Sequence, residues 1–107
     1  MLPGKYTLLG RSVTYNDYDN STGYVYVNLG NSIGVIYGTQ IIHNISLNQL
    51  FIYSIVYDPQ DGILYATTAS DIYAVNTVSN TISGETGISY EATYMLVGPP
   101  NGEIYVA

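Results

Sequence analysis

A turn followed by a tyrosine-containing strand occurs three times in this chain, at intervals of about 40 residues, which is a typical length for a β-structured repeat. This repeat constrains the fold more than any other feature of the sequence. The copies span residues 23–26, 62–65 and 102–105, and each copy ends in its tyrosine. Residues 58–62 and 98–102 lead into the last two copies, and each is a proline-containing turn that ends in Asp-Gly or Asn-Gly. These pairs favour tight hairpins, so the chain repeats a β-structured unit.

The apolar residues between these turns alternate with polar ones, and Val, Ile, Thr and Tyr dominate, as is typical of β-strands. Strands are predicted at residues 24–28, 33–37, 54–58, 63–67 and 72–76, with an outer strand near 81–83. Four short antiparallel strands in about 40 residues are typical of one blade of a β-propeller. The predicted fold class is therefore all-β, built from four-stranded antiparallel propeller blades.

The chain supplies about two and a half such blades. Full blades are expected at residues 12–46 and 54–89, with a possible further outer strand at 6–9. An incomplete blade is expected at 93–107, with strands at 93–97 and 103–107. Because a propeller closes with about four to eight blades, two interpretations remain open. The chain is a segment of a larger propeller, which we favour, or a homo-oligomer whose copies complete the broken blade.

The repeat resembles the YVTN family of β-propeller repeats, in which a turn is followed by a strand that reads approximately Tyr-Val-Thr-Asn. The matching residues are Tyr26, Val27 and Asn28 in the first copy, Tyr65, Ala66 and Thr67 in the second, and Tyr105, Val106 and Ala107 in the third. Residues 74–77 and 79–82 resemble the strand and turn that follow in the family, with Asn76 where aspartate is common; the first copy departs from this pattern after Gly38. The family is found largely in secreted and cell-surface proteins, including surface layers, so the resemblance implies an extracellular or cell-surface location.

The charge balance argues against several classes of partner. The chain carries two basic and eight acidic residues, which gives a formal net charge of −6. Nucleic acids and anionic membrane surfaces are bound through Lys and Arg, so neither is an expected partner. No apolar run approaches the roughly 20 residues of a membrane-spanning helix, and no signal peptide is recognisable after Met1.

Few residues are candidates for metal or catalytic chemistry, and no metal or cofactor is predicted. His43 is the only histidine and there is no cysteine, so we expect an exposed histidine on an outer strand rather than a catalytic or metal-binding one. Residues 16–21 place carboxylates at alternate positions, as calcium loops do, but they lack the glycine and glutamate of an EF-hand. We therefore favour a long hairpin turn over residues 15–23, solvated by its Asn and Asp side chains.

Asp58, Asp61 and Asp71 are the carboxylates that could act as a general acid and base pair. Structural roles at turns and at the start of a strand are the favoured interpretation, and no catalytic residue is predicted. Asn20 and Asn44 each begin an Asn-X-Ser/Thr sequence, so both are possible N-glycosylation sites in a secreted protein.

These features together predict a non-enzymatic, extracellular or cell-surface propeller module with a structural role or an interaction role. Its expected partners are a protein or a glycan, bound through Tyr and Asn side chains. One alternative is a fragment of a propeller enzyme, such as a lactonase-like hydrolase or a quinoprotein, whose site lies in other blades. A second alternative is a strand-exchanging oligomer or filament subunit.

Overall fold

The computed structural model describes residues 15–19, 23–48, 50–89, 91–92, 95–98 and 103–107, and these form ten strands and no helix. Sheet A contains, in spatial order, β1 (Tyr15–Asp19), β2 (Tyr24–Asn28), β3 (Ile33–Tyr37) and β4 (Gln40–Ile45). Sheet B contains β5 (Ser54–Asp58), β6 (Ile63–Thr67), β7 (Asp71–Asn76) and β8 (Thr81–Gly87). Sheet C contains β9 (Met95–Gly98) and β10 (Glu103–Val106).

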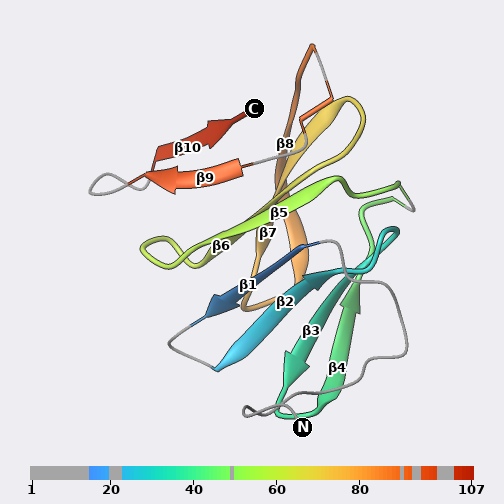
Figure 1. Cartoon of the computed structure of the whole chain (residues 1–107), viewed down its shortest axis with the longest axis vertical. Coiled ribbons are helices and arrows are strands. Elements are labelled where there is room, and N and C mark those ends of the chain that lie inside the picture. Colours follow the sequence, from blue (N-terminus) through green and yellow to red (C-terminus); the bar gives the residue numbers. More distant parts are fainter. Residues whose placement is uncertain (1–14, 20–22, 49, 90, 93–94, 99–102) are drawn as a thin grey trace, which may run out of the picture.

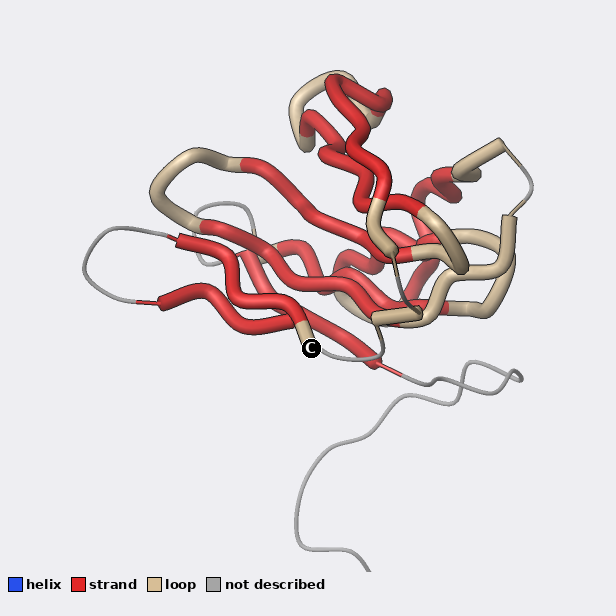
Figure 2. Tube along the Cα trace, turned by 90° about the horizontal axis from the view of Figure 1, so that it is seen from above, coloured by secondary structure: helices blue, strands red, loops and turns tan. Residues whose placement is uncertain are grey.

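All neighbouring strands in these sheets are antiparallel and consecutive in the chain, so each sheet is a meander. The predicted all-β fold class is thereby confirmed, and Figure 2 shows how fully strands account for the described chain. The predicted limits of the strands at 24–28, 33–37, 54–58 and 63–67 are those of the structure. The outer strand near 81–83 extends further, to Gly87.

The first strand is the main correction to the prediction. Residues 15–19 form β1, in which Tyr15 pairs with Asn28 and Asp19 pairs with Tyr24, so the predicted long turn over 15–23 is wrong. The sequence of this strand has no apolar alternation that would indicate a strand. Pairing with β2 nonetheless supplies its backbone hydrogen bonds, and such tertiary pairing outweighs weak local propensity. The predicted strand at 6–9 lies outside the described residues.

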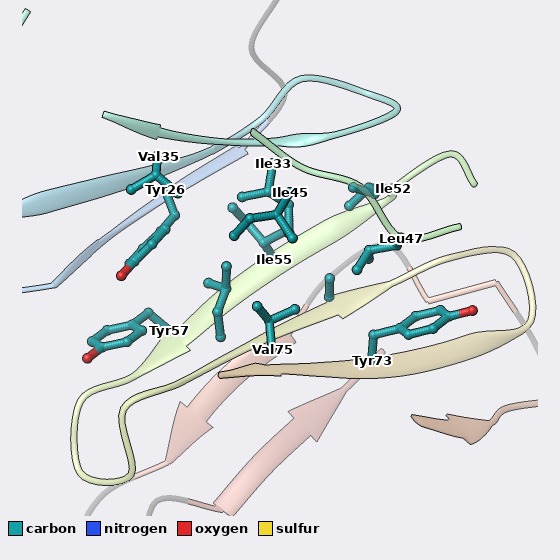
Figure 3. Close-up of a cluster of buried hydrophobic side chains, with 12 residues drawn as sticks. Tyr26, Ile33, Val35, Ile45, Leu47, Ile52, Ile55, Tyr57, Tyr73 and Val75 are labelled. Carbon is teal, nitrogen blue, oxygen red and sulfur yellow. The ribbon is translucent and has the colours of Figure 1, made fainter. Parts of the chain in front are cut away.

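Sheets A and B pack face to face around the principal hydrophobic core (Figure 3). The buried side chains of this core are Tyr26, Ile33, Val35, Ile45, Leu47, Ile52, Ile55, Tyr57, Leu64, Ala66, Tyr73 and Val75. On β6 and β7 these are alternate residues, because successive side chains of a strand point to opposite faces. Sheet B therefore presents Leu64, Ala66, Tyr73 and Val75 to sheet A and its other face to sheet C.

The three sheets follow one another through their first strands, with β5 next to β1 on one side and β9 on the other (Figure 1). Sheets A and B also share an irregularity, because the pairing of their third and fourth strands shifts register after Val35 and again after Ala74, the equivalent position of the next repeat. Gly62 ends the β5–β6 turn at a φ of +68°, and Gly23 occupies the same place before β2 at +78°. Glycine adopts this left-handed conformation without steric cost, which explains its recurrence there.

Candidate functional site

An open groove of about 380 Å³, which we call the β10 groove, lies between sheet B and strand β10. Its lining is mostly apolar and consists of Tyr65, Ile72, Ala74, Gly84, Glu85, Thr86, Ile104 and Val106. These residues come from β6, β7 and β8 on one side and from β10 on the other. The groove therefore lies between two sheets, at the place where the second packing interface of the molecule would form.

The alternation of side chains in β7 explains why one sheet has both a core face and a groove face. Tyr73 and Val75 are buried against sheet A, whereas Ile72 and Ala74, which point the other way, are only half-buried. A strand that is apolar on both faces is expected where sheets cover both sides. The sequence of β7 thus carries an apolar surface for a second sheet as well as for the first.

Two tyrosines have raised pKa values: Tyr65, which lines the groove, and Tyr105, which is exposed on β10. Partial burial raises the pKa of Tyr65 above its ordinary value of 10.0, and the negative charges of Asp58 and Asp61 raise it further. Tyr105 donates a 3.0 Å hydrogen bond from its hydroxyl to a carboxylate oxygen of Glu103, and this bond is the main reason that its pKa is raised. Both phenols are therefore neutral hydrogen-bonding groups at ordinary pH rather than bases.

One buried polar side chain ties each sheet to the next, and neither residue was predicted from the sequence. Asn28 at the end of β2 donates from Nδ2 to the carbonyl oxygen of Ile52 at 2.8 Å, just before sheet B begins. Thr67 at the end of β6 donates from Oγ1 to the carbonyl oxygen of Ala92 at 2.8 Å, just before sheet C begins. Thr67 follows Asn28 by one repeat, and Ala92 follows Ile52 by one repeat, so the repeat spacing is the signal that could have found both ties.

Asp58, Asp61 and Asp71 are not brought together. Asp58 is buried at the end of β5, and its Oδ1 accepts a 3.0 Å hydrogen bond from the Gln60 backbone amide. Asp61 is exposed in the same turn. Asp58 is in line across the sheet with Ile63 and then with Asn76, the last residue of β7. Asp71 is the first residue of β7, about 16 Å along the strand from Asn76. Asp71 therefore cannot form an acid and base pair with either of the others.

Asp58 has one further property that is unusual for a carboxylate. Its Oδ2 is buried and has no hydrogen-bond partner within the described chain, and the same holds for Thr68 Oγ1. Asp58 Oδ1 makes a local bond typical of an Asx turn, which gives the side chain a structural role at the β5–β6 hairpin. In the parts of the chain that the structure describes, no three His, Asp or Glu side chains gather closely enough to hold a metal ion.

His43 and Asn44 lie on the outer part of sheet A. His43 is exposed on β4, the last strand of that sheet, so its predicted exposure on an outer strand is confirmed. Asn44 on the same strand is also exposed, whereas Asn20 lies outside the described residues. Residues 16–19 belong to β1, so the part of the proposed calcium-like segment that the structure describes is a strand rather than a loop.

Across the described ranges, no helix has the length and apolar character needed to cross a membrane. Comparison of the sequence with models of protein families and with curated proteins gave no match.

Proposed function

We propose that the chain is a non-enzymatic β-propeller module of the YVTN type, with a structural or interaction role in an extracellular or cell-surface protein. The single observation that carries this proposal is the repeated packing of the sheets. Each sheet begins with a strand that lies beside the first strand of the next, in the order β1, β5, β9. Successive blades of a propeller are related in this way, because their first strands surround a common central channel.

The two buried ties support the same relation between sheets. The Asn28 bond to Ile52 and the Thr67 bond to Ala92 hold equivalent connections against equivalent strands. A buried carbonyl oxygen without a donor costs about 1–3 kcal/mol, so each tie favours one geometry at each junction. A constant rotation from one sheet to the next leads either to a closed ring or to an open stack, and we propose the ring.

An experiment that extends the chain would separate these two outcomes. By the repeat spacing, residues 68–107 are one unit in phase with Ala107, so copies of this unit can be appended in tandem. We expect single rings by electron microscopy once the total reaches about four to eight sheets. A rod that lengthens with every added unit would contradict a propeller, and copies with the same composition but a scrambled order would serve as the control.

The proposed interaction role rests on exposed aromatic side chains in a chain with few charges. Tyr37 and Phe51 are more than half exposed, and each contacts a second ring, Tyr24 and Tyr53 respectively, at 5.8 and 5.3 Å between centroids. Such rings combine an apolar face with polar edges, which suits contacts with glycans and proteins. A glycan array tests the glycan partner. We expect the chain to bind glycans on the array, and we expect the binding signal to fall at least tenfold in Tyr37→Ser or Phe51→Ser. If no glycan binds, the proposed partner is a protein.

A further inference from the structure

The last strands of sheets A and B, β4 and β8, each leave one edge of their sheet free among the described residues (Figure 1). Neither edge lies at an end of the chain, because β4 is followed by β5 and β8 is followed by β9. A free edge presents a row of backbone donors and acceptors, to which a strand of another molecule can add. Folded proteins therefore protect such edges, commonly with charged side chains.

The two edges differ in this protection. β8 carries the carboxylate of Glu85 and also contains two glycines, whereas β4 contains no Asp, Glu, Lys or Arg. β4 instead contains three isoleucines, of which Ile42 is 48% exposed. The pairing of both strands has the same irregularity, so a bulge does not account for the difference. An uncharged strand of high β-propensity without proline is the kind that pairs with copies of itself, so β4 needs another form of protection.

Asn44 stands at the position of β4 that Glu85 occupies in β8. Asn44 pairs with Gly34. Glu85 pairs with Tyr73, which follows Gly34 by one repeat. Asn44 also begins the sequence Asn-Ile-Ser, an acceptor sequence for N-linked glycans, and both Asn44 and Ser46 are exposed. The position that carries a charge in β8 therefore carries a glycan acceptor sequence in β4.

Glu85 shows that this position stays accessible when a second sheet covers its face. Its partner Tyr73 belongs to the core between sheets A and B and is 2% exposed. Directly paired residues point to the same face of a sheet, so the Glu85 side chain lies on the face that sheet A covers. Glu85 is nevertheless exposed. Asn44 is therefore expected to be accessible whether or not another sheet covers its side of sheet A.

We propose that Asn44 carries an N-linked glycan that shields the free edge of β4, as the charge of Glu85 protects β8. The inference rests on the proposed extracellular location, because N-glycans are surface modifications of secreted proteins. In the transfer, Nδ2 of Asn44 forms a bond to the anomeric carbon of a lipid diphosphate-linked oligosaccharide. The bond from that carbon to the diphosphate oxygen breaks, the lipid diphosphate leaves with the electron pair, and the amide loses one proton to a base of the cell's transferase.

The intact mass of the whole chain, secreted from a eukaryotic cell that N-glycosylates proteins, tests the acceptor. Asn20→Gln serves as the background, because Asn20 and Asn44 begin the two acceptor sequences of the chain. We expect one oligosaccharide per chain in this background, retained in Ser46→Thr and lost in Ser46→Ala and in Asn44→Gln. A secreted chain of unmodified mass would overturn the proposal, as would an oligosaccharide that persists in Asn44→Gln.

Sedimentation of the same chains tests the shielding. Ser46→Ala keeps Asn44 but prevents its modification, and we expect it to self-associate at least tenfold more tightly than the glycosylated chain. Asn44→Glu reproduces the charge of Glu85 and should associate at least tenfold more weakly than Ser46→Ala. The matched control is Ser46→Ala with Val78→Glu, which adds the same charge in the β7–β8 turn, where Val78 is 93% exposed.

Two results of this comparison would overturn the proposal. One is equal association of Asn44→Glu and the Val78→Glu control, and the other is a Ser46→Ala chain that stays monomeric at about 1 mM. Neither measurement depends on whether extended chains close into rings. Rings with an unmodified Asn44 would overturn this proposal alone, whereas rods with a modified Asn44 would overturn the proposed propeller alone.

Discussion

The two faces of sheet B differ in what covers them, although their sequences have the same character. One face presents Leu64 and Val75 to sheet A, and both are completely buried. The other face presents Ile72 and Ala74 to the β10 groove, and both are only half-buried. A strand that carries apolar residues on both faces is suited to burial on both sides. The extent of burial depends on how many strands the neighbouring sheet supplies.

The ties between sheets do not differ in this way. Asn28 and Thr67 make the same kind of buried bond at the two junctions, with donor–acceptor distances of 2.8 Å in both. The junction between sheets B and C is therefore specified as closely as the junction between A and B, and the two differ only in how far their apolar side chains are buried. The ties therefore set the geometry of the repeat, whereas the stability of each interface depends on how much apolar surface it buries.

The largest expected effect compares equivalent residues of the filled core and of the groove. Leu64→Ala should lower the free energy of unfolding by about 3 kcal/mol, because Leu64 is completely buried and its loss leaves a cavity. Ile104→Ala, at the equivalent position of the next repeat, should cost about 1 kcal/mol or less, because solvent already reaches that side chain. Urea denaturation of both variants measures the difference, and equal costs would show that the groove is filled in solution.

The next prediction concerns the ties. Asn28→Ala should cost about 2 kcal/mol, because it removes a buried bond to Ile52 and leaves that carbonyl oxygen without its donor. Thr67→Val should cost at least as much, because it removes the bond to Ala92 and also the buried 2.7 Å bond between Thr67 Oγ1 and Ser54 Oγ. Asn76→Ala is the matched control, since its bonds to the turn amides are exposed and should be worth about 0.5 kcal/mol. Thermal unfolding of the three variants would contradict the assignment if Asn76→Ala were the most destabilised.

A smaller effect distinguishes a glycine required by backbone geometry from one with free space around it. Gly62→Ala should destabilise by about 1 kcal/mol, because the φ of +68° is unfavourable for a residue with a Cβ. Gly84 lies on the groove face of β8, and a Cβ there would meet only the Ala74 Cβ, at 4.0 Å. Gly84→Ala should therefore stabilise by about 0.5 kcal/mol by restricting the unfolded chain. Loss of stability in Gly84→Ala would contradict an open groove.

The smallest effect is on pH dependence. Because the pKa of Tyr65 is raised in the folded state, its neutral form is favoured by folding, so this stabilisation is present below pH 10.0 and is lost as pH rises through the folded-state pKa. Asp61→Asn should lower the pKa of Tyr65, since it removes one of the neighbouring negative charges. Tyrosinate absorbance, measured as the difference from Tyr65→Phe, follows this group alone. An unchanged titration in Asp61→Asn would show that Asp61 has no electrostatic effect at the groove.

The sequence predicted much of the secondary structure because strands and turns depend on the order of residues close together in the chain. Alternation of apolar residues and glycine-ended turns fixed the limits of β2, β3, β5 and β6, and the outer-strand context indicated the exposure of His43. The strand β1 was missed because residues 15–19 lack that alternation and depend on pairing with β2. The Asn28 and Thr67 ties were missed because a buried polar bond depends on which connection passes over the side chain.

By itself, the sequence determined a repeated antiparallel β-unit whose strands each present two faces, because both the side-chain alternation and the turn chemistry are local properties of the chain. Only the tertiary structure decided which of those faces is covered. Ile33 and Ile72 occupy equivalent positions and are the same residue, yet one is buried in the core and the other lines the β10 groove. The difference arises because the burial of a side chain depends on the sheet that packs against it, which the residue and its neighbours in the sequence do not determine.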